Sequence, residues 1–357
     1  MTDVSRMLRE VVWPRRGPAG QTGWLALLPA SWLFGAGVSL RNAAYRLGFL
    51  KAERADIGVV SVGNLSVGGT GKTPLALWLA RALAADGTKV ALLLRGYGGK
   101  ATDVRLVSRG GGPQAHVEDA GDEAVMLAKC FEGVVLTARR RIEGVREAER
   151  LGCRIVVLDD GFQHRALARD FDLVLLDEHE GSLLPAGPLR ERYAALSRAD
   201  AVALVAKEGA AAQSPGETGE KPVFRVRFSP SALVESDGGV WYERPLGGLS
   251  GAKIIAVSGI AKPASFYAAL RGWEVEMVEV FEYPDHHVYT PHDWQTINRR
   301  AHDADYIITT EKDLVKLEHF PFARGKLVAL RITPTVDGGE ELVRAVRDRA
   351  LRLLEGA

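Results

Sequence analysis

Apolar runs rich in Val, Ile and Leu alternate with stretches of helical periodicity from residue 57 onward. Short continuous apolar runs are typical of strands in a parallel sheet, because both faces of such a sheet are covered. We expect strands at 57–62, 89–94, 133–138, 153–158, 171–176 and 200–206. We expect helices between them at 73–85, 121–131 and 139–151. The alternation predicts an α/β fold with a doubly wound sheet, whose ligands lie at the carboxyl ends of the strands.

A second series of strands predicts a smaller α/β domain, with runs at 253–260, 273–281, 304–310 and 326–332. The polar stretch 208–221 is expected to form the boundary before it. The run 223–228 is expected to pair with 326–332 as a two-stranded connector, and 339–355 is expected to be an amphipathic helix. The expected division is an apolar N-terminal segment, a nucleotide-binding domain, the smaller domain and a C-terminal helix, at 1–50, 51–221, 222–335 and 336–357.

The N-terminal segment contains an uncharged apolar run at 23–40, with arginines on both sides. A spanning helix needs about 20 apolar residues, and this run is short and interrupted by Pro29. Trp24 and Trp32 suit the headgroup boundary of a bilayer. We therefore expect a membrane-associating helix that docks on the membrane surface. A buried helix that packs on the domain is the alternative.

Composition narrows the class of protein. The 357 residues are 46% hydrophobic and 25% charged, which is typical of a folded globular chain. The 46 Lys and Arg against 45 Asp and Glu give a net charge of +1, so no nucleic-acid partner is expected. Cys130 and Cys153 form no CxxC pair, which favours a reducing, cytoplasmic compartment.

A glycine-rich loop at 63–74 lies between the first expected strand and an apolar helix. This is the context of a P-loop, in which backbone N–H groups close on phosphate oxygens. Lys72 is expected to reach the β- and γ-phosphates, and Thr73 to bind Mg²⁺; Ser66 stands where the strict pattern has glycine. The expected nucleotide-binding residues are Ser66, Val67, Gly68, Gly69, Thr70, Gly71, Lys72 and Thr73. The chain is thus predicted to be P-loop NTPase-like.

Two adjacent carboxylates, Asp159 and Asp160, follow an apolar strand at the edge where a metal-binding carboxylate is expected. Either one is a candidate direct ligand of Mg²⁺, and an ordinary Asp-Gly turn is the alternative. Asp122 opens an expected helix, so its residue type fits a helix cap or first-turn acid as well as a functional carboxylate. The TTEKD run at 309–313 lacks the pattern that selects guanine, so ATP is the expected nucleotide.

A histidine cluster follows in the second series, at Asp285, His286 and His287. Such a cluster binds metal in some proteins and supplies a base in others. We favour a histidine that orients a carboxylate of the neighbouring domain; a metal site and surface histidines on a solvated loop are the alternatives.

Taken together, these motifs resemble the tetraacyldisaccharide 4'-kinase family, over roughly residues 20–335 and in the same order. LDDGFQHR together with GGTGKTP is the most specific combination. The full set is GNLSVGGTGKTP, RGYG at 95–98, GDE at 121–123, LDDGFQHR at 158–165, PAGPLRE at 185–191, PDHH at 284–287 and TTEKD at 309–313.

The resemblance implies an ATP- and Mg²⁺-dependent transferase that phosphorylates the 4'-hydroxyl of tetraacyldisaccharide 1-phosphate to form lipid IVA. It implies Asp122 as the catalytic base, His286 as its partner, and Lys72 at the transferring phosphate. Arg95, Arg190 and Glu191 are candidates for contacts to the sugar-phosphate headgroup. The implied location is the cytoplasmic face of the inner membrane, peripheral or monotopic, with the lipid disaccharide 1-phosphate and the membrane surface as partners. No protein partner is implied.

Two other classes share parts of this pattern. An ATPase or small-molecule kinase of the dethiobiotin-synthetase type is also doubly wound with a P-loop, but does not need the apolar run at 23–40. A non-catalytic nucleotide-binding module docked on a membrane would tolerate the loss of Asp122, whereas a kinase would not.

Overall fold

A computed structural model describes residues 7–177, 181–206 and 221–352. The chain divides into two compact units. The first unit comprises Met1–Thr73, Val157–Arg227 and Val336–Ala357, and the second comprises Pro74–Val156 and Phe228–Thr335. The domain boundaries expected from the sequence stay a prediction, and the stretch expected at 208–221 lies almost wholly outside the described residues.

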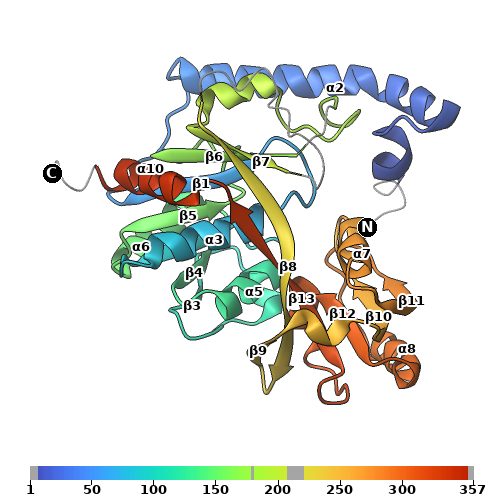
Figure 1. The fold of residues 1–357 in the computed structure, drawn as a ribbon. Helices are drawn as coiled ribbons and strands as arrows, with labels where there is room; N and C mark the ends of the chain where they lie inside the picture. The colour runs from blue at the N-terminus through green and yellow to red at the C-terminus, as the bar shows by residue number, and fades with distance from the viewer. Residues whose placement is uncertain (1–6, 178–180, 207–220, 353–357) are drawn as a thin grey trace. The chain divides into compact units, whose positions relative to one another are not determined.

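Parallel strands form the centre of the first unit (Figure 1). β1 (Gly58–Asn64) pairs with β6 (Phe171–Leu176), β6 with β7 (Ala201–Val205), and β7 with the start of β8 (Val223–Asp237). Every residue of β1 and β6 is buried, which explains why these runs are mostly apolar rather than alternating. Helix α10 (Gly339–Leu351) contacts β1 and β6. β5 (Ile155–Asp159) ends in this unit with the first of the paired aspartates.

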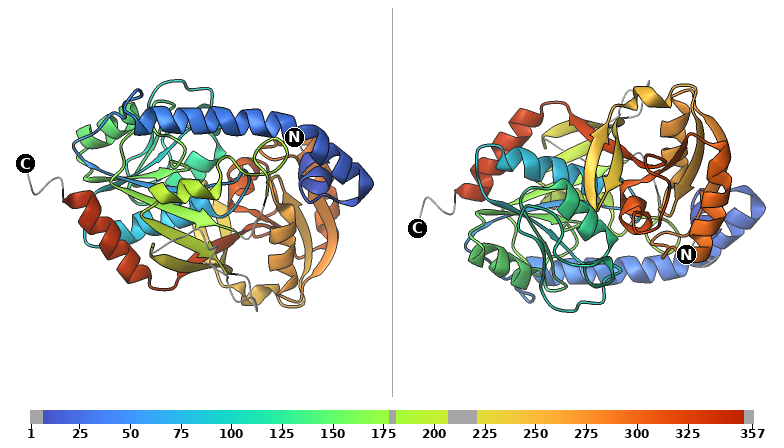
Figure 2. Two further views of the ribbon diagram at one scale, coloured as in Figure 1. Left: turned by 90° about the horizontal axis from the view of Figure 1, so that it is seen from above. Right: turned by 90° about the horizontal axis from the view of Figure 1, so that it is seen from below.

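The N-terminal helices also belong to the first unit. The π-helix η1 (Leu8–Val12) precedes α2 (Gly17–Arg46), which both views of Figure 2 show as one long helix. α2 continues past Pro29 and is long and apolar enough to cross a membrane by length and composition. One narrow face of α2 packs on the rest of the first unit. Ser31 donates to the carbonyl oxygen of Leu183 at 2.8 Å, and Phe34 packs on the buried cluster that includes Leu183.

The opposite side of α2 is exposed and apolar. Leu33 and Leu40 are 76% and 74% exposed, and Trp32 and Leu25 are also exposed. A buried core helix would not leave such side chains in solvent. Of the two readings of the run at 23–40, the helix that docks on a surface therefore fits this arrangement better.

The second unit contains two series of strands. In the first, β2 (Val90–Leu94) pairs parallel with β4 (Val134–Thr137), which pairs antiparallel with β3 (Arg105–Ser108). The helices of this part are the Pro74–Ala84 portion of α3 (Lys72–Ala84), α4 (Val117–Ala120), α5 (Asp122–Cys130) and α6 (Arg141–Arg150).

The second series has the order β11, β10, β12, β13, and all of its pairs are parallel. These strands are β10 (Lys253–Ser258), β11 (Glu276–Glu282), β12 (Tyr306–Thr310) and β13 (Leu327–Val336). The helices between them are α7 (Pro263–Arg271), α8 (Pro291–Arg300) and α9 (Glu311–Leu317). β13 neighbours β8, which forms an antiparallel hairpin with β9 (Val240–Arg244). Short 3-10 helices complete the chain: η2 (Tyr193–Arg198), η3 (Leu246–Leu249) and η4 (Ala301–Asp303).

The predicted strands and helices are present, and most of their ends shift by a few residues. The run expected at 223–228 is the exception, because β8 continues to Asp237. It lies between β7 and β13 in the strand order and does not form a separate two-stranded connector with 326–332. The fold is α/β, as predicted. The helix expected at 339–355 is described as Gly339–Leu351, and the residues after 352 lie outside the described part of the chain.

Candidate functional site

The glycine-rich loop of the first unit joins the end of β1 to Lys72 at the start of α3. Gly68 and Gly71 have φ values of 108° and 92°, a region that side chains with a Cβ rarely adopt. The Asn64 amide donates to the Thr70 hydroxyl at 2.9 Å, and the Val67 N–H donates to the Pro188 carbonyl oxygen at 2.8 Å. These bonds hold the loop in a curved conformation, whose backbone N–H groups suit phosphate oxygens.

The metal-binding candidates lie beside this loop in the same unit. The Thr73 hydroxyl donates to Oδ2 of Asp159 at 2.7 Å, and Lys72 Nζ lies 3.7 Å from Oδ1 of Asp160. Mg²⁺ prefers oxygen ligands such as hydroxyls and carboxylates. In phosphate-transfer sites it usually binds one or two protein carboxylates, with water and phosphate oxygens as its other ligands. Thr73 and Asp159 therefore fit a magnesium ion. No group of three metal-binding side chains gathers among the residues that the structure describes, as expected for so few protein ligands.

Arg190 and Glu191 extend the first-unit site in two directions. The Arg190 guanidinium makes two bonds to the Asp160 carboxylate, at 2.7 and 2.9 Å. Glu191 is 1% exposed and accepts hydrogen bonds from Asn42 at 2.7 Å and Arg198 at 3.1 Å. Arg190 therefore binds Asp160 beside the P-loop, and the next residue, Glu191, binds Asn42 near the end of α2.

In the second unit, Gly121 determines where α5 begins. Its φ is 88°, and a Cβ there would lie 2.3 Å from the carbonyl oxygen of Tyr97. Gly121 is the N-cap, so Asp122 is the first helical residue and not the cap. Asp122 is 4% exposed, and its Oδ1 accepts from the N–H of Glu123 at 2.9 Å. A buried carboxylate at this position needs polar partners.

His286 supplies one of these partners. Its Nδ1 lies 3.1 Å from both carboxylate oxygens of Asp122, and its ring lies 5.0 Å from the ring of Tyr97. The φ of His286 is 60°, a left-handed conformation that costs about 1–3 kcal/mol for such a residue. The backbone N–H of His286 donates to the carbonyl oxygen of Gly259 at 3.2 Å. Strain of this kind is concentrated at functional sites.

Two lysines of α9 complete the group. Lys312 Nζ lies 3.1 Å from Nε2 of His286 and 3.2 Å from Asp285, and Lys316 Nζ lies 3.6 Å from Asp122. The spacing of four places both lysines on one face of the helix. Neither lysine is among the expected site residues, because TTEKD assigns no role to Lys312 and Lys316 lies outside that run.

These contacts decide the protonation states. Burial alone would raise the pKa of Asp122, but the hydrogen bond from His286 and the charges of Lys312 and Lys316 lower its pKa below the usual value. Burial alone would lower the pKa of His286, yet Asp122 raises it above the usual value. The Lys312 ammonium can donate to Nε2 when the ring is neutral with its proton on Nδ1, and this tautomer also donates to Asp122. Asp122 is therefore an anion that accepts a hydrogen bond.

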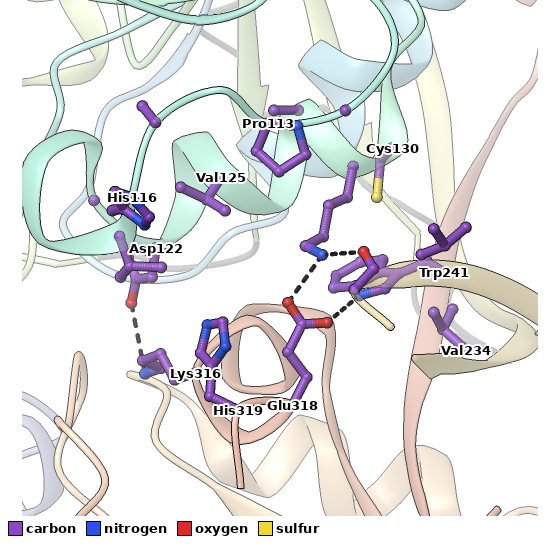
Figure 3. Close-up of a pocket in the computed structure, with 18 of the residues that line it drawn as sticks. Pro113, His116, Asp122, Val125, Cys130, Val234, Trp241, Lys316, Glu318 and His319 are labelled. Carbon is purple, nitrogen blue, oxygen red and sulfur yellow. Dashed lines mark hydrogen bonds and ion pairs between the residues drawn. The ribbon is translucent and has the colours of Figure 1, made fainter. Parts of the chain in front are cut away.

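Asp122 lines a cavity of about 1420 Å³ within the second unit. Figure 3 shows Asp122 and Lys316 on one side of it and Trp241 and Glu318 on the other. Glu318 accepts from the Trp241 indole at 2.8 Å and pairs with Lys129 at 2.9 Å. The cavity is large enough for a ligand the size of a nucleotide or a disaccharide.

The remaining predicted residues have different positions. Arg95 is exposed and belongs to the second unit. His287 Nε2 lies 3.1 Å from Asp293, and its ring stacks on Tyr283 at 4.5 Å. The Asp285-His286-His287 run forms no metal cluster in the described ranges, and His286 contacts the carboxylate of Asp122 within the same unit. The roles of Arg95, Arg190 and Glu191 toward a substrate stay predictions.

Comparisons with known proteins point to one family. The family model described as tetraacyldisaccharide-1-P 4'-kinase matches residues 23–350. The tetraacyldisaccharide 4'-kinase of Anaeromyxobacter sp. (strain K) is 41% identical over 362 residues, covering 96% of this chain and 95% of the relative. That of Syntrophotalea carbinolica is 43% identical, covering 85% and 87%. A crystal structure of the "apo" form of LpxK from Aquifex aeolicus in complex with ATP superposes with a TM-score of 0.78 at 32% identity, covering 92% of this chain and 99% of that one.

Proposed function

The chain belongs to the tetraacyldisaccharide-1-phosphate 4'-kinase family, and we propose that it transfers the γ-phosphoryl group of ATP to the 4'-hydroxyl of its lipid acceptor. The product is the 1,4'-bisphosphate, lipid IVA. The observation that carries the proposal is the buried, anionic Asp122 carboxylate, which is hydrogen-bonded to His286 and lines a large cavity.

The P-loop of the first unit binds the donor. Its backbone N–H groups and Lys72 hold the triphosphate, as the resemblance to the ATP-bound Aquifex aeolicus enzyme supports. Thr73 and Asp159 are the residues that would hold Mg²⁺, and Asp160 keeps Lys72 and Arg190 in position. The ion, when bound, neutralises charge on the phosphate oxygens.

Asp122 acts on the acceptor. The acceptor oxygen forms a bond to the γ-phosphorus as the bond from that phosphorus to the β-phosphate oxygen breaks, and ADP leaves. The hydroxyl proton passes to the Asp122 carboxylate. A carboxylate with a lowered pKa suffices, because phosphoryl transfer depends mainly on positioning and charge stabilisation. His286 then donates to a carboxyl group that has gained a proton, which keeps Asp122 oriented through the reaction.

The acceptor is a membrane lipid, and α2 provides a surface for it. We propose that the exposed side of α2, with Trp32, Leu33 and Leu40, docks on the bilayer and places the enzyme at the cytoplasmic face of the inner membrane. The arginines on both flanks of this run suit anionic headgroups. The membrane surface and the lipid disaccharide 1-phosphate are then the partners of the enzyme.

The test is transfer of labelled phosphate from ATP to tetraacyldisaccharide 1-phosphate in detergent micelles. We expect a labelled bisphosphorylated lipid with the wild type and none with Lys72→Met. Exposed Lys253→Met, which lies in the second unit, is the matched control. ATP hydrolysis without lipid labelling would contradict the proposal and indicate an ATPase.

A further inference from the structure

Three arginines of the first unit gather near the end of α2, and two of them pair with the carboxylate of Glu191. Arg198 Nη2 donates to Glu191 Oε1 at 3.1 Å, and Arg41 Nη2 lies 3.8 Å from the same oxygen. Arg165 donates to the carbonyl oxygen and the side-chain oxygen of Asn42, at 2.9 and 3.3 Å. We call Arg41, Arg165 and Arg198 the arginine cluster. Its members come from α2, from the loop after β5, and from η2.

Positive charge exceeds negative charge in this cluster. Glu191 is shared by Arg41 and Arg198, and Arg165 bonds to an asparagine rather than to a carboxylate. The pKa of Arg165 is lowered, first by burial and then by the charge of Arg198 and other arginines. Like charges brought together at a cost in energy are typical of a site that receives an anion.

The side chains are held in fixed orientations. The Arg198 guanidinium lies 4.5 Å from the ring centre of Phe162, and the Arg165 guanidinium 5.0 Å from that of Tyr45. A guanidinium has five N–H donors, and the bonds above use one nitrogen of each of these two arginines. Arginines oriented in this way offer the planar, paired donors that suit a phosphate group.

The cluster is linked to both parts of the proposed reaction. Glu191 follows Arg190, whose guanidinium binds Asp160 beside the P-loop. Arg41 follows Leu40 on α2, and the apolar side chains of Leu40, Leu47 and Phe49, close to this end of the helix in sequence, are exposed. The cluster therefore includes a residue of α2, the helix proposed to meet the bilayer, and its central carboxylate is next in sequence to the arginine that binds Asp160.

We propose that the arginine cluster binds a phosphomonoester of a membrane lipid, namely the phosphate that the acceptor already carries at position 1. The inference rests on the proposed function, since it assigns a binding site to the non-reacting end of the same acceptor. A phosphomonoester carries close to two negative charges at neutral pH, which matches the excess of positive charge. Glu191 serves to hold Arg41 and Arg198 together before the phosphate arrives.

The test compares two acceptors, tetraacyldisaccharide 1-phosphate and the same disaccharide with its phosphate removed. For Arg165→Gln and Arg198→Gln, we expect KM for the 1-phosphate acceptor to rise about tenfold, with kcat and KM for ATP close to wild type. We expect KM for the acceptor without phosphate to be the same in these variants and the wild type. Arg54→Gln removes an exposed arginine of the same unit, which pairs with Asp170, and is the control.

Equal effects on the two acceptors, or no effect on either, would overturn the assignment. A melting-temperature measurement shows whether Arg165→Gln folds. If it does not, Arg165→Lys takes its place. The lysine keeps the charge without the paired donors, so we expect a smaller rise in KM for the 1-phosphate acceptor.

A second measurement distinguishes the phosphate of the acceptor from that of a bulk lipid headgroup. It also distinguishes failure of the arginine site from failure of the proposed kinase activity. Wild type and variants are sedimented with phosphatidylcholine vesicles that contain either phosphatidic acid, a phosphomonoester, or phosphatidylglycerol, a phosphodiester. Retention on phosphatidic acid that the variants lose, with KM for the acceptor unchanged, would overturn the acceptor assignment in favour of a bulk lipid headgroup. If the wild type labels no lipid at all, the proposed function fails, and a preference for the phosphomonoester that the variants lose would still support the arginine site.

Discussion

His286 Nδ1 lies at the same distance, 3.1 Å, from the two carboxylate oxygens of Asp122. The residues are 164 positions apart in sequence, and the histidine adopts a strained backbone conformation at this contact. A bond of this kind orients the carboxylate and keeps its pKa low.

Replacement of His286 by Ala should raise the pKa of Asp122, because the bond that favours the anion is lost while burial, which disfavours it, remains. A base works only when deprotonated, so the acid limb of the pH profile of kcat should move to higher pH. We expect kcat at neutral pH to fall by about 10²-fold, at the low end for loss of acid–base assistance. A profile with an unmoved acid limb would count against the pairing.

Replacement of Lys312 by Met should raise the pKa of His286, since the ammonium opposes a second proton on the ring. The pKa of Asp122 should also rise, because one cation that stabilises its anion is removed. NMR titration of the imidazole carbons of His286 measures the first shift, and Lys312→Arg should reverse most of it. An unchanged histidine titration in Lys312→Met would show that the Lys312 contact does not control the ring.

Asp159 should bind Mg²⁺ directly, because its carboxylate accepts a hydrogen bond from Thr73, the other expected Mg²⁺ ligand. The carboxylate of Asp160 is instead paired with the cations Lys72 and Arg190. We expect Asp159→Asn to raise the Mg²⁺ concentration for half-maximal activity by about tenfold or more. Asp160→Asn should lower kcat with a smaller change in the Mg²⁺ requirement. The Mg²⁺ dependence of the rate checks both variants. A larger rise in the Mg²⁺ requirement for Asp160→Asn than for Asp159→Asn would assign the direct contact to Asp160.

The exposed side of α2 should control binding to vesicles. Burial of one large apolar side chain is worth about 1.5–3 kcal/mol, so Leu33→Glu or Leu40→Glu should weaken partition into lipid vesicles by about tenfold or more. The melting temperature should hardly change, because both side chains are exposed in the folded protein. Val240→Glu, at a position on β9 whose side chain is 55% exposed, is the control. Equal vesicle binding by all of these proteins would rule out α2 as the contact surface.

The strands and the P-loop could be predicted because their signals are local. Buried parallel strands are mostly apolar on both faces, and Gly68 and Gly71 occur where the backbone needs a positive φ. β3 was missed because it has four residues, begins with an exposed arginine, and lies in a sequence without a strand pattern. Such a short strand forms only because β4 supplies its hydrogen bonds.

Contacts between distant segments were harder to predict. Asp122 fitted a helix cap equally well from its local sequence, and only the resemblance singled it out. The lysines of α9 and the arginines around Glu191 carry no local signal, because charged residues on a helix or loop usually face solvent. Their position depends on α9 packing against α5 and on α2 packing beside η2.

The most direct test of the account compares Asp122→Asn with wild type for both lipid phosphorylation and ATP binding. The asparagine keeps the size of the side chain but accepts no proton, so kcat should fall by about 10²–10⁴-fold while the Kd for ATP stays within about twofold. Lipid phosphorylation by Asp122→Asn close to the wild-type rate would contradict the central claim that this carboxylate accepts the acceptor's proton.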